Sequence, residues 1–269
     1  MNSSHAIGVF DSGVGGLTVL RALTELLPHE NFIYLGDTAR LPYGTKSAET
    51  VSQYALQAVK LLMTEPVKLI VIACNTASAL ALPTLTQTLS PMPCLDVITP
   101  GAEEAATCSR TGRIAVLATE STVRSKAYET AIRSFRTDAH VKTLACNLLV
   151  ALAEEGWCEG KEAEAIIKRY LDELGDGFDT IVLGCTHFPL LTATLRKLLP
   201  PHIVIINSAA TTAQSVQRHL KSRHLNHTQS TPGARRFLVT DAPERFTHMA
   251  KRLLNTDIAG TVTFAYLSP

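Results

Sequence analysis

The sequence contains one local pattern twice, and this repeat restricts the possible folds more than any other feature. Two apolar runs rich in β-branched residues, 69–73 and 180–184, are each followed by a cysteine, Cys74 or Cys185, and then by small polar residues. Such runs are typical of buried strands. The two cysteines are 111 positions apart, and the patterns around them repeat with nearly the same offset. The chain is therefore predicted to fold into two related halves, each with a cysteine at the end of a strand.

Strand and helix patterns alternate along both halves. In the first half, strands are predicted at residues 5–10, 31–36, 67–73 and 95–98, and helices at 16–27, 46–64 and 76–89. In the second half, strands are predicted at 113–118, 141–145 and 179–184, and helices at 122–135 and 161–174. This alternation favours parallel strands that are joined by crossover helices.

The last part of the chain returns to the pattern of the first half. Strands are predicted at 203–206, 237–240 and 261–267, a helix at 209–220 and a mobile loop at 221–234. Asp241 is predicted to be the N-cap of a further helix, with Glu244 three residues on. We expect an α/β fold of two pseudo-symmetric open-sheet (βα) domains with the active site in the cleft between them. Residues 1–97 and 208–269 would form the first lobe, and residues 98–207 the second.

The composition excludes several classes of protein. The 269 residues carry 25 basic and 24 acidic side chains without a basic run of five, so no nucleic-acid partner is expected. No apolar stretch approaches the roughly 20 residues of a membrane span, and the N-terminus lacks the pattern of a secretory signal. Six cysteines without a CxxC pair argue against a metal cluster. Four of them are interpreted as small buried hydrophobic residues: Cys94, Cys108, Cys146 and Cys158. A reduced, cytoplasmic protein without a metal is expected.

Polar clusters follow five of the predicted strands. They comprise residues 11–16, 37–44, 74–76, 119–123 and 185–187. Ligands of open α/β sheets bind outside the carboxyl ends of the strands, so these clusters are expected to converge on one site.

The first of these clusters, DSGVGG at residues 11–16, could bind an anion through backbone amides. The dinucleotide fingerprint is incomplete because Thr18 occupies the place of its third glycine, and the Gly-Lys-Ser/Thr ending of a P-loop is absent. A small carboxylate is therefore favoured over a phosphate. A tight turn capped by Asp11 is the purely structural alternative.

The two repeated thiols are the candidate catalytic bases. A thiol beside a helix N-terminus is expected to have a pKa below its usual value of about 8.5, because the helix amides favour the thiolate. Asp11 and His187 are the ionisable neighbours expected to adjust the two thiols, although His187 could instead only cap its turn. The predicted catalytic set is Cys74, Cys185, Asp11 and His187.

The polar clusters offer neutral donors rather than cations. The predicted donors are Ser12, Tyr43, Asn75, Thr76, Thr122 and Thr186. Such a site suits a small carboxylate, whereas a polyphosphate or a long nucleic acid would require Lys or Arg. Asp11 or Glu154 is available for an ammonium group.

Four motifs carry a family resemblance. FDSGVGGLTVLRAL, YLGDTARLPYG, ACNTASA and LGCTHFPLL, in this order, resemble motifs of the glutamate racemases of bacterial cell-wall synthesis. The similarity covers residues 7–191, with a weaker echo at 237–246. It implies a cofactor-independent racemase that acts on glutamate, supplies D-glutamate for peptidoglycan and forms a homodimer.

The resemblance also implies roles for individual residues. Cys74 would remove the α-proton of D-glutamate and Cys185 that of L-glutamate, from opposite faces. The implied substrate-binding positions are Asp11, Ser12, Tyr43, Gly44, Asn75, Thr76, Thr122, Glu154, Thr186 and His187. The sequence departs from the family at residues 146–155, which lack the usual cysteine-proline start, and at Ala118, where glycine is common.

Three other functions remain open at the level of the sequence. The chain could racemise aspartate or another small acidic amino acid. It could be a nucleotide-dependent kinase that uses residues 11–16. It could also bind an amino acid without catalysis, although a binding protein has no need of thiols on two opposing strands.

Overall fold

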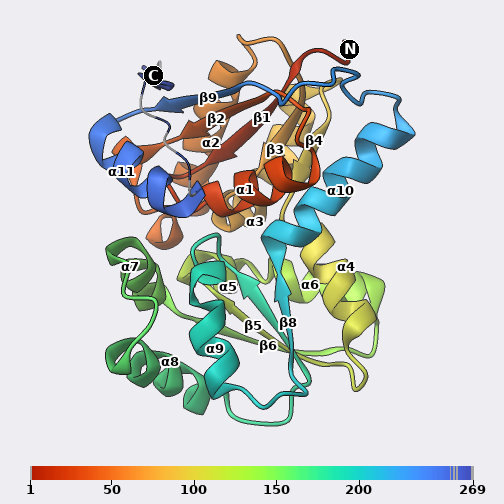
Figure 1. Cartoon of the computed structure of the whole chain (residues 1–269). Coiled ribbons are helices and arrows are strands. Elements are labelled where there is room, and N and C mark those ends of the chain that lie inside the picture. Colours follow the sequence, from red (N-terminus) through yellow and green to blue (C-terminus); the bar gives the residue numbers. More distant parts are fainter. Residues whose placement is uncertain (1, 255, 257, 259, 268–269) are drawn as a thin grey trace.

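Two parallel β-sheets form the framework of the computed structural model, which describes residues 2–254, 256, 258 and 260–267. The strand order is β10-β9-β2-β1-β3-β4 in the first sheet and β6-β5-β7-β8 in the second (Figure 1). This arrangement confirms the predicted α/β class with two open sheets. The order β2-β1-β3-β4 is repeated by β6-β5-β7-β8, which is the pseudo-symmetry that the repeated sequence pattern predicts.

The elements of the two halves follow one another along the chain. The first sheet contains β1 (Ala6–Asp11), β2 (Phe32–Gly36), β3 (Val67–Ile72), β4 (Cys94–Asp96), β9 (Arg235–Val239) and β10 (Val262–Phe264). It is covered by α1 (Leu17–Leu26), α2 (Ala48–Leu62), α3 (Asn75–Leu89), α10 (Ser208–Ser222) and α11 (Pro243–Leu254). The second sheet contains β5 (Arg113–Ala118), β6 (His140–Ala145), β7 (Thr180–Gly184) and β8 (Val204–Asn207). Its helices are α4 (Ile98–Cys108), α5 (Glu120–Ser125), α6 (Ala127–Phe135), α7 (Asn147–Glu155), α8 (Lys161–Leu174) and α9 (Thr192–Leu198).

Helices cover both faces of each sheet. Along β1, Ile7 and Val9 join the core under α1, α10 and α11, whereas Ala6 and Phe10 join the core under α2 and α3. Successive side chains of a strand point to opposite faces, so a strand covered on both faces is apolar at nearly every position. This is why the runs that predict β3 and β7 are uninterrupted.

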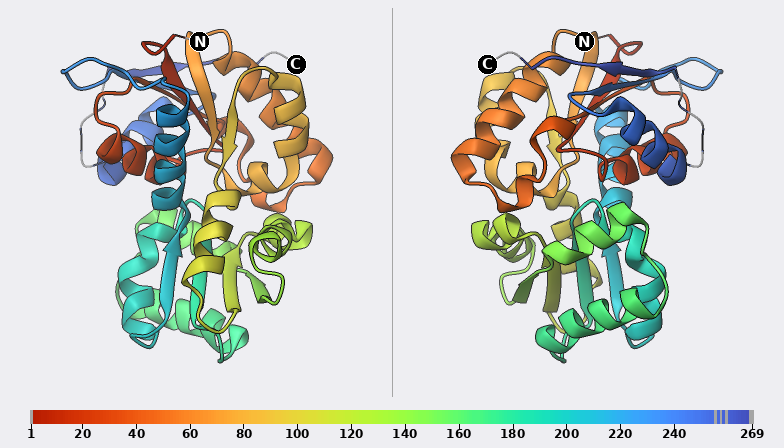
Figure 2. Two further views of the ribbon diagram at one scale, coloured as in Figure 1. Left: turned by 90° about the vertical axis from the view of Figure 1, so that its right-hand side faces the viewer. Right: turned by 90° about the vertical axis from the view of Figure 1, so that its left-hand side faces the viewer.

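Two helices connect the sheets. α4 leads from β4 of the first sheet to β5 of the second, and α10 leads back from β8 and packs against α1. The left view of Figure 2 shows α4 and α10 next to each other on one side of the molecule. The predicted lobe boundaries, at 97/98 and 207/208, coincide with the starts of these two helices and stay a prediction.

The predicted elements differ from the structure in the second half. They omit α4, α7 and α9. The strand predicted at 95–98 is too long, because the Asp96 carboxylate accepts the N–H groups of Ile98 (2.7 Å) and Thr99 (2.8 Å) and starts α4 there. The helix predicted at 122–135 is divided into α5 and α6 by Lys126, which has a left-handed φ of 57°.

Two predictions near the C-terminus are also wrong. α11 begins at Pro243, and Asp241 is not its N-cap because the Asp241 carboxylate accepts the adjacent Ala242 N–H at 2.8 Å. The strand predicted at 261–267 is shorter, because only Val262–Phe264 pairs with β9.

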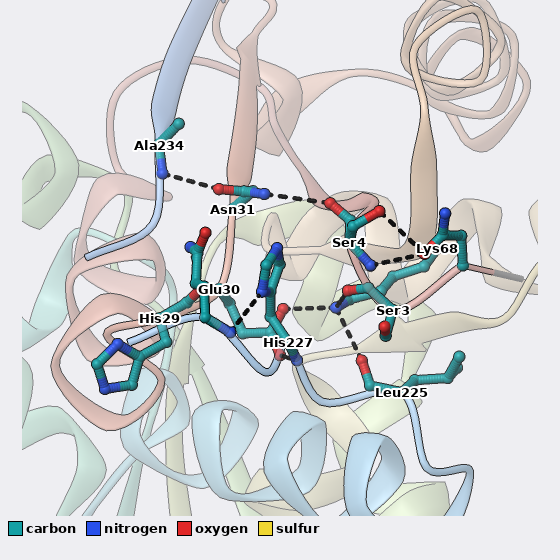
Figure 3. Close-up of polar contacts among 11 residues, drawn as sticks. Ser3, Ser4, His29, Glu30, Asn31, Lys68, Leu225, His227 and Ala234 are labelled. Atoms are coloured by element: carbon teal, nitrogen blue, oxygen red, sulfur yellow. Dashed lines mark hydrogen bonds and ion pairs between the residues drawn. The ribbon is translucent and has the colours of Figure 1, made fainter. Parts of the chain in front are cut away.

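The stretch predicted as a mobile loop, 221–234, is bonded to the first sheet at the end remote from the pocket described below. The buried Lys68 ammonium donates to the Glu30 carboxylate (2.6 Å) and to the Leu225 carbonyl (2.8 Å) (Figure 3). The other oxygen of Glu30 accepts the His227 N–H at 2.8 Å. These contacts attach the stretch to β3 and to the connection before β2, and its mobility stays a prediction.

Candidate active site

A pocket of about 290 Å³ lies between the two sheets, beyond the carboxyl ends of β1, β3, β5 and β7. Ten of the site residues predicted from the sequence line it: Ser12, Tyr43, Gly44, Cys74, Asn75, Thr76, Glu154, Cys185, Thr186 and His187. The remaining two, Asp11 and Thr122, are buried behind its wall. The fold thus brings the predicted residues into one region. Their roles in binding and catalysis stay predictions.

Cys74 lies at the junction of β3 and α3. Its sulfur accepts the Ala77 N–H at 3.4 Å as the N-cap of α3, and its thiol donates to Ser12 Oγ at 3.5 Å. Burial, the largest cause, and the nearby Asp11 carboxylate together raise the pKa of Cys74 to about 12, although these two hydrogen bonds act to lower it. The helix N-terminus does act to lower this pKa, but the expectation that the pKa of Cys74 lies below its usual value is wrong. The hydrogen bond from the Ala77 N–H does not compensate for the loss of water around a buried thiolate.

Cys185 begins a chain of three side chains. Its sulfur lies 3.7 Å from His187 Nδ1, and His187 Nε2 lies 3.2 Å from Glu154 Oε1. Burial lowers the pKa of His187, but the contacts with Cys185 and Glu154 outweigh burial and raise that pKa to about 10. The same contact with His187 lowers the pKa of Glu154. A cationic imidazole next to Cys185 stabilises a thiolate there.

Asp11 stands at the end of β1, behind Cys74. Its Oδ2 accepts the Gly13 N–H at 2.9 Å, while its Oδ1 is buried without a hydrogen-bond partner. Burial raises the pKa of Asp11, and the positive charge of His187 opposes this rise. A buried acceptor without a partner is costly, and Asp11 does not line the pocket itself.

Residues of the second lobe pack directly against the glycine-rich segment after β1. A Cβ on Gly15 would lie 2.3 Å from Thr186 Oγ1 and 2.5 Å from His187 Cε1. Close by, Thr18 in α1 donates to the Thr186 carbonyl at 2.8 Å. Glycine fits here because the second lobe approaches the backbone so closely. The space in which a nucleotide phosphate would lie is therefore filled by side chains.

Three threonine hydroxyls meet across the two lobes. Thr76 Oγ1 and Thr122 Oγ1 each lie 3.0 Å from Thr119 Oγ1. Thr119 lines the pocket, whereas Thr122 supports it from behind. A hydroxyl can donate or accept, so this cluster can adapt its protons to a carboxylate.

Tyr43 and Asn75 occupy the pocket wall differently from the sequence-based expectation. The Tyr43 hydroxyl donates to the buried Asp37 carboxylate, so it is not directed to a ligand. Asn75 Oδ1 accepts from the Tyr128 hydroxyl at 2.7 Å, while Asn75 Nδ2 is buried without a partner. This amide is fixed in orientation and retains a free donor.

Helix α7 supplies pocket residues that the sequence analysis missed. Asn147, Val150 and Ala151 line the pocket together with Glu154. Positions spaced by three and four residues lie on one face of a helix, and this spacing was the available signal. It was overlooked because α7 itself was not predicted. Leu41, Pro42 and Thr119 also line the pocket; they belong to the predicted clusters 37–44 and 119–123 but were not singled out as site residues. Thr45 lies outside these clusters and was missed.

The described part of the chain contains neither a candidate metal cluster nor a candidate membrane-spanning helix. Among residues 2–254, 256, 258 and 260–267, no group of three or more His, Cys, Asp or Glu side chains is arranged to hold a metal ion. Over the same residues, none of the helices combines the length and the apolar character needed to cross a membrane.

Comparisons with known proteins agree with this geometry. The sequence matches the family described as Asp/Glu/Hydantoin racemase over residues 7–216. The chain belongs to this family. It is 47% identical over 250 residues to a glutamate racemase of Geobacter metallireducens, an alignment that covers 93% of this chain and 92% of the relative. The family confirms the resemblance read from the four motifs, and the chain is accordingly an isomerase of the racemase class.

Solved structures of glutamate racemases share the fold. The structure of isoform RacE1 from Bacillus anthracis superimposes with a TM-score of 0.95 at 36% identity and covers 99% of both chains. The glutamate racemase of Francisella tularensis, solved in complex with D-glutamate, superimposes with a TM-score of 0.92 at 35% identity and covers 98% of both chains.

Proposed function

We propose that this racemase interconverts L-glutamate and D-glutamate by a two-base mechanism in which Cys74 and Cys185 act from opposite sides of the substrate. One observation carries the proposal: two thiols at equivalent strand ends of the two lobes line the same pocket. A single base that reaches only one face of a planar carbanion cannot readily return a proton to the other face. Paired thiols on facing lobes remove that difficulty.

The protonation states fit a reaction that starts from L-glutamate. The raised pKa of Cys74 keeps it a thiol, so it can donate a proton to the carbanion. In the proposal Cys185 removes the α-proton, and the cationic His187 beside it would stabilise negative charge on its sulfur during this step. In the reverse direction Cys74 must lose its proton, and an ammonium group placed near Asp11 would offset the carboxylate charge that opposes this loss.

The groups around the thiols suit an acidic amino acid. Asn75 Nδ2 and the hydroxyls of Thr76 and Thr119 are available to carboxylates. Asp11 and Glu154 carry the negative charge that an ammonium group requires. The D-glutamate complex of the Francisella relative, which has the same fold, supports glutamate as the substrate. Aspartate differs by one methylene, a difference that a pocket discriminates only modestly.

The proposal includes the setting of the reaction. The enzyme would act in the cytoplasm as a homodimer, without a cofactor, and supply D-glutamate for peptidoglycan. Six cysteines that form no disulfide in the structure are consistent with a reducing compartment. The kinase alternative is disfavoured because side chains of the second lobe fill the space above Gly15.

Isotope exchange tests the mechanism directly. In deuterated water, L-glutamate and D-glutamate should each incorporate deuterium at Cα, and turnover of glutamate should exceed that of aspartate. Cys74→Ala or Cys185→Ala should abolish racemisation while circular dichroism shows an intact fold. Racemisation that persists after both substitutions would contradict the mechanism. Binding of glutamate without exchange would instead indicate a non-catalytic binding protein.

A further inference from the structure

A single arginine of the first lobe binds the end of a pocket helix in the second lobe. The right view of Figure 2 shows α11 of the first lobe lying next to α7 of the second. Arg252 in α11 donates through Nη2 to the carbonyls of Ala153 and Glu154, at 3.1 Å each. The same helix α7 carries Asn147, which lines the pocket with Glu154.

The contact lies where α7 terminates. Gly156 follows the helix with a left-handed φ of 81°, and a Cβ there would lie 2.5 Å from Arg252 Nη1. Carbonyls in the last turn of a helix lack intrahelical partners and carry partial negative charge. A guanidinium that donates to two of them therefore adds to the glycine cap and holds the last turn of α7 in place.

Among the residues that the structure describes, this turn of α7 also faces a cavity and a longer ion pair on the side of the first lobe. A cavity of about 130 Å³ separates Glu154 from Phe246 and Met249 of α11. A second charged contact, between Arg245 and Glu155, is 4.0 Å long and involves two exposed side chains. Arg252 is also exposed, but it donates at 3.1 Å to two backbone carbonyls and so holds the turn more closely than this pair does.

We propose that Arg252 is a positioning residue for the racemase reaction, because it fixes the last turn of α7 and thereby the side chain of Glu154 relative to His187. The path is short. Glu154 provides one of the two carbonyls that Arg252 binds, and its carboxylate lies 3.2 Å from His187 Nε2. His187 in turn contacts Cys185 at 3.7 Å. The inference rests on the proposed function, since it concerns how that site is assembled.

A double-mutant cycle tests the coupling. Arg252→Ala should lower kcat/KM for glutamate by about fivefold to twentyfold, mainly through kcat, because the acid–base chain loses its geometry. Arg252→Lys should restore part of this loss, since an ammonium can reach one of the carbonyls. In a Glu154→Gln background, Arg252→Ala should lower kcat/KM by less than about twofold. An equal loss in both backgrounds would overturn the proposal.

A second measurement separates this proposal from the function itself. Hydrogen exchange of the peptide that covers residues 147–156 should be at least about threefold faster in Arg252→Ala than in the unmutated chain. Arg21→Ala, which removes an exposed ion pair with Glu25 in α1, is the matched control and should change neither exchange nor kcat/KM. Unchanged exchange in Arg252→Ala would refute the positioning role. Absence of glutamate turnover in the unmutated chain would refute the proposed function instead.

Discussion

At the scale of single residues, the two repeated cysteines occupy unlike environments. Cys74 is buried next to the Asp11 carboxylate, and both burial and this charge raise its pKa. Cys185 contacts His187, an imidazole whose raised pKa keeps it cationic at neutral pH. Two strand ends with the same sequence pattern thus place their thiols in different electrostatic environments, one beside a carboxylate and one beside a cationic imidazole.

Asp11→Asn should lower the pKa of the Cys74 thiol. Removal of a neighbouring negative charge favours the thiolate, so a shift of about one unit is expected. The pH dependence of the alkylation rate of the folded protein by iodoacetamide measures this shift. Cys74→Ala is the control that identifies the reacting thiol. An unchanged or higher pKa in Asp11→Asn would show that the carboxylate does not act on Cys74.

Glu154→Gln should move the alkaline limit of activity to lower pH. The Glu154 carboxylate helps to raise the pKa of His187 to about 10, so the neutral amide should let His187 lose its proton earlier as pH rises. A profile of kcat/KM against pH should shift downward by about one unit on its alkaline side. The control Glu155→Gln changes the adjacent exposed carboxylate, and an equal shift in that variant would contradict the role of Glu154.

At the scale of elements, buried polar contacts fix segments that the hydrophobic pattern leaves unspecified. Asp96 starts α4 with two backbone hydrogen bonds immediately after β4. Lys68, inside β3, joins Glu30 and the Leu225 carbonyl and so attaches the connection after α10 to the first sheet. Asp96 bonds to the backbone of the turn that follows it, and Lys68 bonds to a backbone carbonyl far away in the sequence. Neither contact can be read from the hydrophobic pattern.

Lys68→Met should destabilise the fold by about 3–5 kcal/mol, because it leaves the Glu30 carboxylate buried without its cation. Urea unfolding followed by circular dichroism measures the change. Addition of Glu30→Gln to Lys68→Met should recover part of the loss. Arg21→Ala breaks an exposed pair and should cost less than about 1 kcal/mol. A similar small cost for Lys68→Met would show that the buried pair contributes little.

At the scale of the whole molecule, the pocket depends on how closely the two lobes approach. Gly15 of the first lobe meets Thr186 and His187 of the second, and Thr18 donates to the Thr186 carbonyl. On another side of the pocket, Arg124 of α5 donates to the Lys46 carbonyl of the first lobe. The width of the pocket is therefore set by contacts between two lobes that are each built around their own sheet.

Gly15→Ala should impair catalysis more than stability. The added methyl group cannot fit 2.3 Å from Thr186 Oγ1, and displacement of the second lobe relieves the clash. We expect kcat/KM to fall by at least about tenfold, with a change in Tm of only a few degrees. Gly101→Ala is the control, because its nearest atoms would be 3.8 Å away. Retained activity in Gly15→Ala would indicate that the lobe spacing is not critical.

Much of the fold could be predicted from the sequence, because strands covered on both faces are apolar throughout and their helices alternate with them. This explains why β1, β3, β5 and β7 were recognised. Two of the helices were missed for physical reasons. α4 follows β4 after a single residue, and the apolar residues of the stretch 146–155 do not mark one clear face of α7. Asn147, Val150 and Ala151, which line the pocket from α7, were missed for this reason, whereas Glu154 was predicted from the family resemblance.

The sequence by itself determined the two open sheets, the family, and the pair of cysteines at equivalent strand ends, because local periodicity and motif spacing encode these features. Only the tertiary structure decided the chemistry of each thiol. Burial and long-range neighbours control the pKa of Cys74, and the Cys185–His187–Glu154 chain requires α7 to dock beside β7. Such contacts join residues that are far apart in the chain, and a local sequence pattern does not reveal how close these residues lie in the folded protein.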